Sequence, residues 1–322
     1  MIGRNEGRRL EECLASLKQA GDAAIVYVDS GSTDGSVAHA QGVGAALVEL
    51  DMNTPFTAAR ARNAGLKMLV QTWPELRHVH FVDGDCKVDP DWPASALLLM
   101  ERQPKAAAVC GRLKERHPDA SVFNRLCQFE WDGSGQFGEV RYCGGIALMR
   151  ISALADVDGF NPAMIAGEEP ELCVRLRSKG WSIWRVDGLM AIHDADMHRF
   201  GQWWLRVKRA GYAFAEGAAM HGAAPYFHYV EQRRRALVWG IAIPLAALLA
   251  LLRFGPWALG LLAVYPLQMI RLSVRDAQRR RVRDRILRAV FLTIGRFAEA
   301  QGVLRYYWLQ LKRERATLIE YK

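Results

Sequence analysis

The stretch His80-Phe81-Val82-Asp83-Gly84-Asp85 decides how this chain folds. Val79, Phe81 and Val82 are typical of a buried strand, and the strand ends abruptly in two aspartates that flank a glycine. Two carboxylates held this close raise each other's pKa, and a divalent cation between them removes that cost. Oxygen ligands suit Mg²⁺ or Mn²⁺. The stretch therefore predicts a metal site at a strand end, and an ordinary Asp-Gly turn is the structural alternative.

Strands and helices alternate on the amino-terminal side of that stretch. Residues 23–28 predict a strand that ends in the acidic turn 29–35, residues 45–50 predict another strand, and residues 56–70 predict a helix. This alternation is typical of a mostly parallel sheet with crossover helices. Ligands of such sheets bind at the carboxyl ends of strands, so we expect Asp29 and Asp83 to face one crevice.

The expected sheet needs a first strand, and the sequence has too few residues at the corresponding place to form it. A strand should precede Gly3-Arg4-Asn5-Glu6, and only Met1 and Ile2 stand before these residues. We therefore expect the first strand to be missing and one wall of the crevice to be incomplete.

The segment that follows Asp85 predicts further elements. We expect a helix over 90–100, a strand over 106–109 and a polar loop over 112–131 that covers the site. A strand over 142–149 should follow, with Gly144-Gly145 in its first part. Glycines at that start would let a ligand lie against the backbone. Acids and Pro170 around Glu168-Glu169 predict a helix start, because acids favour the positive end of a helix. A strand over 181–186 comes next, and His193 follows it.

Taken together, six motifs resemble the family-2 inverting glycosyltransferases, which have the GT-A fold, over roughly residues 1–200. The motifs are Asn5-Glu6, Asp29-Ser30-Gly31-Ser32-Thr33-Asp34-Gly35, Ala61-Arg62-Asn63-Ala64-Gly65, Asp83-Gly84-Asp85, Gly144-Gly145 and Glu168-Glu169-Pro170-Glu171-Leu172. The resemblance implies an α/β nucleotide-diphospho-sugar transferase with a Rossmann-like, mostly parallel sheet. It also implies an acid-x-acid motif that binds Mg²⁺ or Mn²⁺.

The resemblance also implies a role for each matching residue. The metal ligands would be Asp83, Asp85 and His193. The nucleotide would contact Asn5, Glu6, Asp29, Arg62 and Asp83. The donor sugar and the acceptor would meet Gly144, Gly145 and Trp204. Glu169 would be the catalytic base, beside Glu168, although the family usually has aspartate there.

Five of these roles have structural alternatives. Asp29 would otherwise cap a turn, and Arg62 would otherwise lie on a solvated helix face. Glu169 would otherwise be one of the acids that favour a helix start. His193 would otherwise be an ordinary loop histidine, and Trp204 an anchor at a membrane surface.

Composition and charge point to a membrane as the second partner. The chain has 322 residues, 51% of them hydrophobic, a net charge of +9 and six cysteines without a CxxC pair. The cysteines are typical of reduced thiols in a cytosolic domain. Residues 236–252 and 254–270 are two uncharged runs of 17 residues each, near the lower limit for spanning a bilayer. Arginine clusters flank both outer ends, which predicts a hairpin whose ends face the cytoplasm.

We therefore expect a GT-A catalytic domain over 1–200, an interfacial helical region over 201–235, and a membrane hairpin with a basic amphipathic tail over 236–322. A buried helical hairpin of a soluble protein is the alternative to the membrane hairpin. The predicted enzyme moves a sugar from a nucleotide-diphosphate donor to a lipid-linked or glycan acceptor, with inversion, at the cytoplasmic face of the inner membrane. Nucleic acid is not expected as a partner, because the basic clusters flank apolar runs. A nucleotidyltransferase and a non-catalytic membrane scaffold with a degenerate GT-A domain remain the rival functions.

Overall fold

The computed structural model describes residues 1–131, 137–278, 280–314 and 316–320. The chain divides into two compact units, Met1–His198 and Arg199–Lys322. This division lies two residues before the boundary at residue 200 that we expected.

A parallel three-stranded sheet begins the first unit. Its strand order is β1 (Ile2–Gly3), β2 (Val26–Asp29), β3 (Ala46–Glu49), with Ile2 opposite Val28 and Val26 opposite Ala46. The crossover helices are α1 (Arg8–Gln19), α2 (Ser36–Gly42) and α3 (Ala58–Thr72). All four residues of β2 are buried, because a central parallel strand is covered on both faces. Asp29 consequently lies at the carboxyl end of a buried strand, as the sequence indicated.

A second, mixed sheet carries the acid-Gly-acid stretch. Its order is β4 (His78–Phe81), β8 (Ala147–Arg150), β6 (Ala106–Glu115), β9 (Ser182–His193), β5 (Cys86–Val88), and β7 (Gly138–Val140) also pairs with β9. The pair β6–β9 is parallel, and the other pairs of this sheet are antiparallel. A parallel bridge between Ile2 and Asp83 joins the two sheets. Asp29 and Asp83 therefore come from neighbouring strand ends, one on each side of β1.

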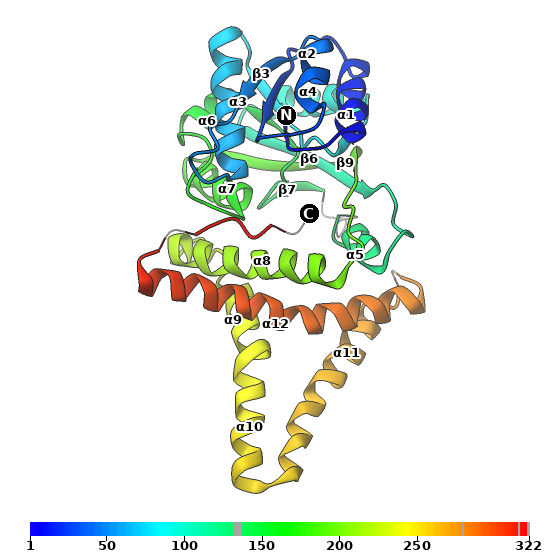
Figure 1. Ribbon diagram of the computed structural model, residues 1–322, viewed down its shortest axis with the longest axis vertical. Coiled ribbons are helices and arrows are strands. Elements are labelled where there is room, and N and C mark those ends of the chain that lie inside the picture. Colours follow the sequence, from blue (N-terminus) through cyan, green and yellow to red (C-terminus); the bar gives the residue numbers. More distant parts are fainter. Residues whose placement is uncertain (132–136, 279, 315, 321–322) are drawn as a thin grey trace. The chain divides into compact units, whose positions relative to one another are not determined.

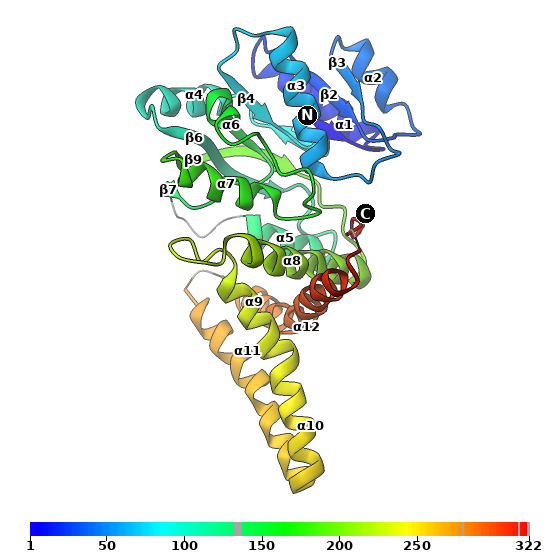
Figure 2. The same cartoon turned by 90° about the vertical axis from the view of Figure 1, so that its left-hand side faces the viewer.

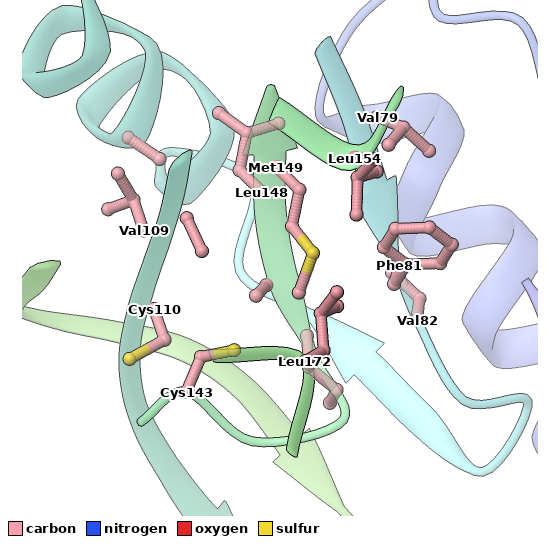
Figure 3. Close-up of a cluster of buried hydrophobic side chains, with 14 of the residues drawn as sticks. Val79, Phe81, Val82, Val109, Cys110, Cys143, Leu148, Met149, Leu154 and Leu172 are labelled. Atoms are coloured by element: carbon pink, nitrogen blue, oxygen red, sulfur yellow. The ribbon is translucent and has the colours of Figure 1, made fainter. Parts of the chain in front are cut away.

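Helices cover the faces of the second sheet. They are α4 (Trp92–Arg102), α5 (Val122–Trp131), α6 (Ile151–Ala155) and α7 (Glu168–Ser178). Side chains of β4, β6 and β8 meet Leu172 of α7 in one apolar core (Figure 3). In the same core, Phe81 lies edge-on against Phe160, with ring centroids 5.1 Å apart. This core fixes the strand end that carries Asp83 against the helix start that carries Glu169.

Several expectations about this unit need correction. Gly144 and Gly145 lie in the segment before β8, because that strand begins only at Ala147. The segment 112–131 is not a loop throughout: β6 continues to Glu115, and α5 begins at Val122. His193 is the last residue of the long strand β9 and does not follow the strand.

The place of the first strand is partly filled. Ile2 and Gly3 form β1, and the Ile2 amide donates to the Val82 carbonyl oxygen at 3.2 Å while the Val28 amide donates to the Met1 carbonyl oxygen at 2.9 Å. We expected the first strand to be missing. The structure instead has a strand of two residues in its place.

The second unit is helical. It contains α8 (Phe200–His221), α9 (Val230–Leu237), the π-helical turn η1 (Val238–Ala242), α10 (Ile243–Phe254), the 3₁₀ helix η2 (Pro256–Ala263), α11 (Val264–Arg275) and α12 (Val282–Lys312). Helices α10 and α11 project from α12 as a hairpin that η2 closes (Figures 1 and 2). Within the described residues, Val230–Phe254 and Pro256–Arg275 are long and apolar enough to cross a membrane, and almost none of either segment is buried.

Two glycines let α8 and α12 cross in contact. A Cβ atom on Gly211 would lie 2.0 Å from the carbonyl oxygen of Glu299, and one on Gly302 would lie 2.0 Å from that of Lys208. No side chain fits at either position, so the backbones of the two helices touch there. The expected amphipathic tail thus forms α12, a helix of 31 residues that packs closely on α8.

Candidate functional site

The first feature of the site is one buried guanidinium between three carboxylates. Arg62 on α3 donates from Nη2 to Asp83 Oδ1 at 3.1 Å and from Nη1 to Glu168 Oε1 at 2.8 Å. Glu169 Oε1 lies 2.9 Å from the same Nη1. The Arg62 side chain is only 4% exposed, so these ion pairs are shielded from water. The three acids come from the end of β4 and the start of α7, and Arg62 holds them together.

Gly145 closes this cluster. A Cβ atom on Gly145 would lie 2.7 Å from Arg62 Nη2, 2.9 Å from Glu169 Oε1 and 3.2 Å from Asp83 Oδ2. Around Gly144, in contrast, nothing lies within 4 Å of such an atom. The backbone of Gly145 therefore lies directly on the ion-pair cluster, and no larger residue fits there without displacing a charged group.

Burial and charge shift the pKa values in this cluster. Burial, together with the neighbouring Glu168, raises the pKa of Glu169 to about 7, although Arg62 opposes both effects. For Arg62, burial alone would lower the pKa, but the charges of Glu169, Asp83 and Glu168 outweigh it and raise the pKa. Arg62 is therefore permanently charged, whereas Glu169 can exchange a proton near neutral pH.

Asp85 lies in a second group, beside His193. The Asp85 carboxylate oxygen Oδ1 is 3.4 Å from His193 Nε2, and Cys86 Sγ also lies close to both. The His193 ring packs against Trp131 in a tilted arrangement, with ring centroids 4.3 Å apart. Burial raises the pKa of Cys86 well above its ordinary value, so this thiol stays protonated and is a poor metal ligand. Oxygen from Asp85 and nitrogen from His193 are the ligand types that suit Mn²⁺ and tolerate Mg²⁺.

The expected metal set is thus only partly assembled. Asp85 and His193 lie together, whereas one oxygen of Asp83 is engaged by Arg62. Asp83 is 30% exposed and is separated from Asp85 by one residue, so a reorientation about its side-chain bonds would bring it toward the same ion. The residues present therefore fit a divalent cation.

The remaining predicted nucleotide contacts lie in two interlocked turns. The Asp29 carboxylate accepts from the Tyr27 hydroxyl at 3.0 Å and from the backbone N–H groups of Gly31 and Ser32 at 2.9 and 2.8 Å. Asn5 Oδ1 accepts from the Thr33 amide at 2.7 Å. These bonds hold the loop that follows β2 against the turn that follows β1. The hydrogen bonds that Asp29 accepts from Gly31 and Ser32 are those of a turn cap, which is the structural alternative for this residue.

Two other acids near the site are engaged by arginines. Glu6 pairs with Arg9 at 2.9 Å. Glu171 is fully buried and receives Arg175 Nε and Nη2 at 2.8 to 3.0 Å. The second pair supports α7, because it joins successive turns of that helix.

Trp204 belongs to the second unit. Its indole N–H donates to Gln301 Oε1 at 3.1 Å, and its ring packs on Phe200 with centroids 5.6 Å apart. A contact between Trp204 and an acceptor stays a prediction.

The sequence interpretation missed the partners of Arg62. We expected this arginine to contact the nucleotide or to lie on a solvated face. A signal was present, because Arg62, Leu66 and Leu69 recur at helical spacing on the face of α3 that turns inward. An arginine on an apolar helix face needs buried acids as partners.

The amino-terminal half of the chain has a recognisable family. Residues 1–157 match the family model described as glycosyl transferase family 2. This segment is similar to glycosyl transferase family 2. The match covers β1 to β8, including Asp83 and Asp85, and ends before Glu168 and Glu169. No curated protein sequence matches the chain significantly.

Solved structures give the fold of this protein. A mannosyltransferase from Pyrobaculum calidifontis, in complex with GDP-Man and Mn²⁺, superimposes with a TM-score of 0.58 at 18% identity, over 95% of this chain and 86% of that one. Glucosyl-3-phosphoglycerate synthase from Mycobacterium tuberculosis has a TM-score of 0.47 at 16% identity, over 69% of this chain and 78% of that one. The first likeness confirms the GT-A fold, and the second is too distant to add to it.

Proposed function

We propose that this protein transfers a sugar from a nucleotide-diphosphate donor to a lipid-linked or glycan acceptor, with inversion at the anomeric carbon. The single observation that carries the proposal is the meeting of Asp83, Glu168 and Glu169 around Arg62, next to the Asp85–His193 pair. This arrangement combines a place for a metal-bound diphosphate with a carboxylate whose pKa is near neutral. The mannosyltransferase that shares the fold was solved with a nucleotide sugar and Mn²⁺, which supports the same class of donor.

Asp83, Asp85 and His193 would hold Mg²⁺ or Mn²⁺ in this proposal. The ion, when bound, neutralises negative charge on the departing diphosphate. Asn5, Glu6 and Asp29 lie at the carboxyl ends of β1 and β2, where they would define the nucleotide end of the crevice. The engaged carboxylate of Asp29 would mainly hold the shape of that pocket, because protein donors already use both of its oxygens.

Glu169 would take the proton from the acceptor hydroxyl. A base works best when its pKa lies near the working pH, and the pKa of Glu169 is about 7. Glu168 and Arg62 would act on Glu169 in opposite directions, since the first raises its pKa and the second lowers it. Gly145 would let the donor sugar approach this group, because its backbone lies against the cluster without a side chain.

The hairpin formed by α10 and α11 would anchor the enzyme in the inner membrane. Its side chains are almost wholly exposed, which is unfavourable in water and favourable in lipid. Arginines 233–235 precede the first apolar run and Arg271 follows the second, so both ends of the hairpin would stay in the cytoplasm. Nucleotide sugars and a membrane-bound acceptor would then meet at the cytoplasmic face.

The decisive experiment is to incubate membranes that contain the protein with nucleotide sugars and Mn²⁺. Release of a nucleoside diphosphate supports the glycosyltransferase. Release of pyrophosphate would instead identify a nucleotidyltransferase. Failure to bind any nucleotide sugar would favour the non-catalytic scaffold.

A further inference from the structure

The segment that joins α6 to α7 turns sharply toward α3. Asp158 and Gly159 both have left-handed backbone conformations there, with φ angles of 56° and 67°. A Cβ atom on Gly159 would lie 2.7 Å from Asn63 Oδ1, so only glycine fits at this position. The turn therefore delivers the next residue, Phe160, directly to α3.

Side chains of α3 hold this segment by its backbone. Asn63 Nδ2 donates to the carbonyl oxygen of Phe160 at 2.7 Å, and the Phe160 amide donates to Asn63 Oδ1 at 2.9 Å. Thr57, at the N-cap of the same helix, donates to the carbonyl oxygen of Pro162 at 3.0 Å. Because the two bonds of Asn63 use both backbone groups of one residue, they fix the position and the direction of Phe160.

The Phe160 ring lies between the apolar core and the ion-pair cluster. The residue is 1% exposed, and its ring packs edge-on with that of Phe81. The guanidinium carbon of Arg62 lies over the same ring, 5.6 Å from its centroid. A cation over an aromatic face is attracted to it, and more strongly where water is excluded. The ring therefore contacts the guanidinium that holds the three acids together.

We propose that Asn63 and Phe160 are positioning residues of the ion-pair cluster. Asn63 fixes the backbone of Phe160, and the Phe160 ring limits the movement of the Arg62 guanidinium. In that orientation one guanidinium nitrogen faces both Glu168 and Glu169. Both positioning residues act through Arg62, and their effect on catalysis rests on the proposed function, in which Glu169 is the base.

The ring supplies what the carboxylates do not. Electrostatic attraction depends weakly on angle, whereas the donors of a guanidinium lie in one rigid plane. Arg62 Nη1 lies 2.8 Å from Glu168 Oε1 and 2.9 Å from Glu169 Oε1, so a rotation of the group would break both contacts together. A buried ring against the guanidinium makes that rotation costly, because it leaves little room for water to replace the lost partners.

The test follows the rotation of the Arg62 guanidinium by nuclear magnetic resonance, in the full-length protein in detergent with isotope-labelled arginine. Loss of one signal in Arg62→Lys assigns the resonance. Phe160→Leu keeps an apolar side chain but removes the aromatic face, and it should speed the rotation by about threefold or more. Asn63→Ala should act in the same direction, because the ring loses its backbone anchor. Phe123→Leu, which changes a buried ring of α5, is the matched control and should leave the rotation unchanged.

The kinetics of transfer give a second readout, which a loss of stability alone would not move in this way. Phe160→Leu should lower kcat by about threefold or more, while KM for the nucleotide sugar changes by less than about twofold. The reason is that the base is displaced, whereas the nucleotide end of the crevice is intact.

An unchanged rotation rate in Phe160→Leu, or an equal increase in Phe123→Leu, would overturn the proposal. So would an unchanged kcat in a variant whose Arg62 rotates faster. Phe160→Leu decides the outcome if Asn63→Ala does not fold. The rotation is measured without substrate, so faster rotation in a protein that transfers no sugar would support the positioning role and would count against the proposed function alone.

Discussion

Arg62 Nη1 lies 2.9 Å from Glu169 Oε1, and both side chains are largely buried. The same nitrogen is 2.8 Å from Glu168 Oε1, so one guanidinium nitrogen serves two adjacent carboxylates. This contact joins α3 to the start of α7, and it holds the proposed base in a fixed place.

Replacing Arg62 with Met should destabilise the first unit by about 3–5 kcal/mol, because three acids would remain buried without their cation. The measurement is urea unfolding followed by tryptophan fluorescence. Lys67→Met on the exposed side of the same helix is the control and should change stability by less than about 0.5 kcal/mol. An Arg62→Met protein as stable as the control would show that the cluster is not held by this arginine.

Glu169→Gln should retain binding of nucleotide and Mn²⁺ but lose transfer by about 10²-fold or more, since the amide cannot accept the acceptor proton. Glu139→Gln, which changes an exposed acid on β7, should keep full activity. Retained turnover in the Glu169 variant would assign the base to another residue.

The rate of transfer should depend on pH through Glu169. The carboxyl must be ionised to act as a base, and its pKa is about 7. The value of kcat/KM should therefore rise about tenfold per pH unit below pH 7 and level off above it. A profile that is flat between pH 5.5 and pH 7 would contradict this role, and Glu169→Gln should abolish the dependence in whatever activity remains.

Gly145→Ala should reduce activity strongly, whereas Gly144→Ala should have little effect. The new methyl group at position 145 would meet Arg62 and Glu169 at under 3.0 Å, while nothing lies within 4 Å at position 144. Steady-state rates of the two variants, with circular dichroism to check folding, make a matched comparison. Equal activities would show that the cluster can shift without harm.

Asp85→Asn and His193→Ala should each weaken Mn²⁺ binding by about tenfold or more, because each removes one proposed ligand of the pair that lies 3.4 Å apart. Electron paramagnetic resonance of free Mn²⁺ measures this directly. Asp187→Asn, at an exposed position, serves as the control. Unchanged affinity in both variants would place the metal elsewhere.

In the second unit, Gly211→Val should separate α8 from α12. Its Cβ would lie 2.0 Å from the Glu299 carbonyl oxygen, so the helix backbones would have to move apart. Gly201→Ala, on the same helix with nothing within 4 Å, should be tolerated. Thermal unfolding in detergent should show a loss of several degrees for Gly211→Val and none for the control.

Local sequence patterns determined much of this protein. Apolar runs followed by acids placed Asp29 and Asp83 at strand ends, and two uncharged runs indicated the hairpin. These features depend on neighbours within a few residues, where side-chain periodicity reports the backbone directly. Local patterns predicted the end of a strand less well where the strand continued beyond its most apolar residues, as β6 and β9 do.

Only the tertiary structure decided which charges meet. Arg62 and Glu168 are 106 positions apart in the sequence, and Asp85 meets His193 because β5 pairs with β9. Such contacts depend on strand order and register, which the spacing of residues along one segment does not encode. The sequence by itself therefore supplied the acids and the family resemblance, and the packing of the two sheets decided that Arg62 would join the proposed metal-binding motif to the proposed base.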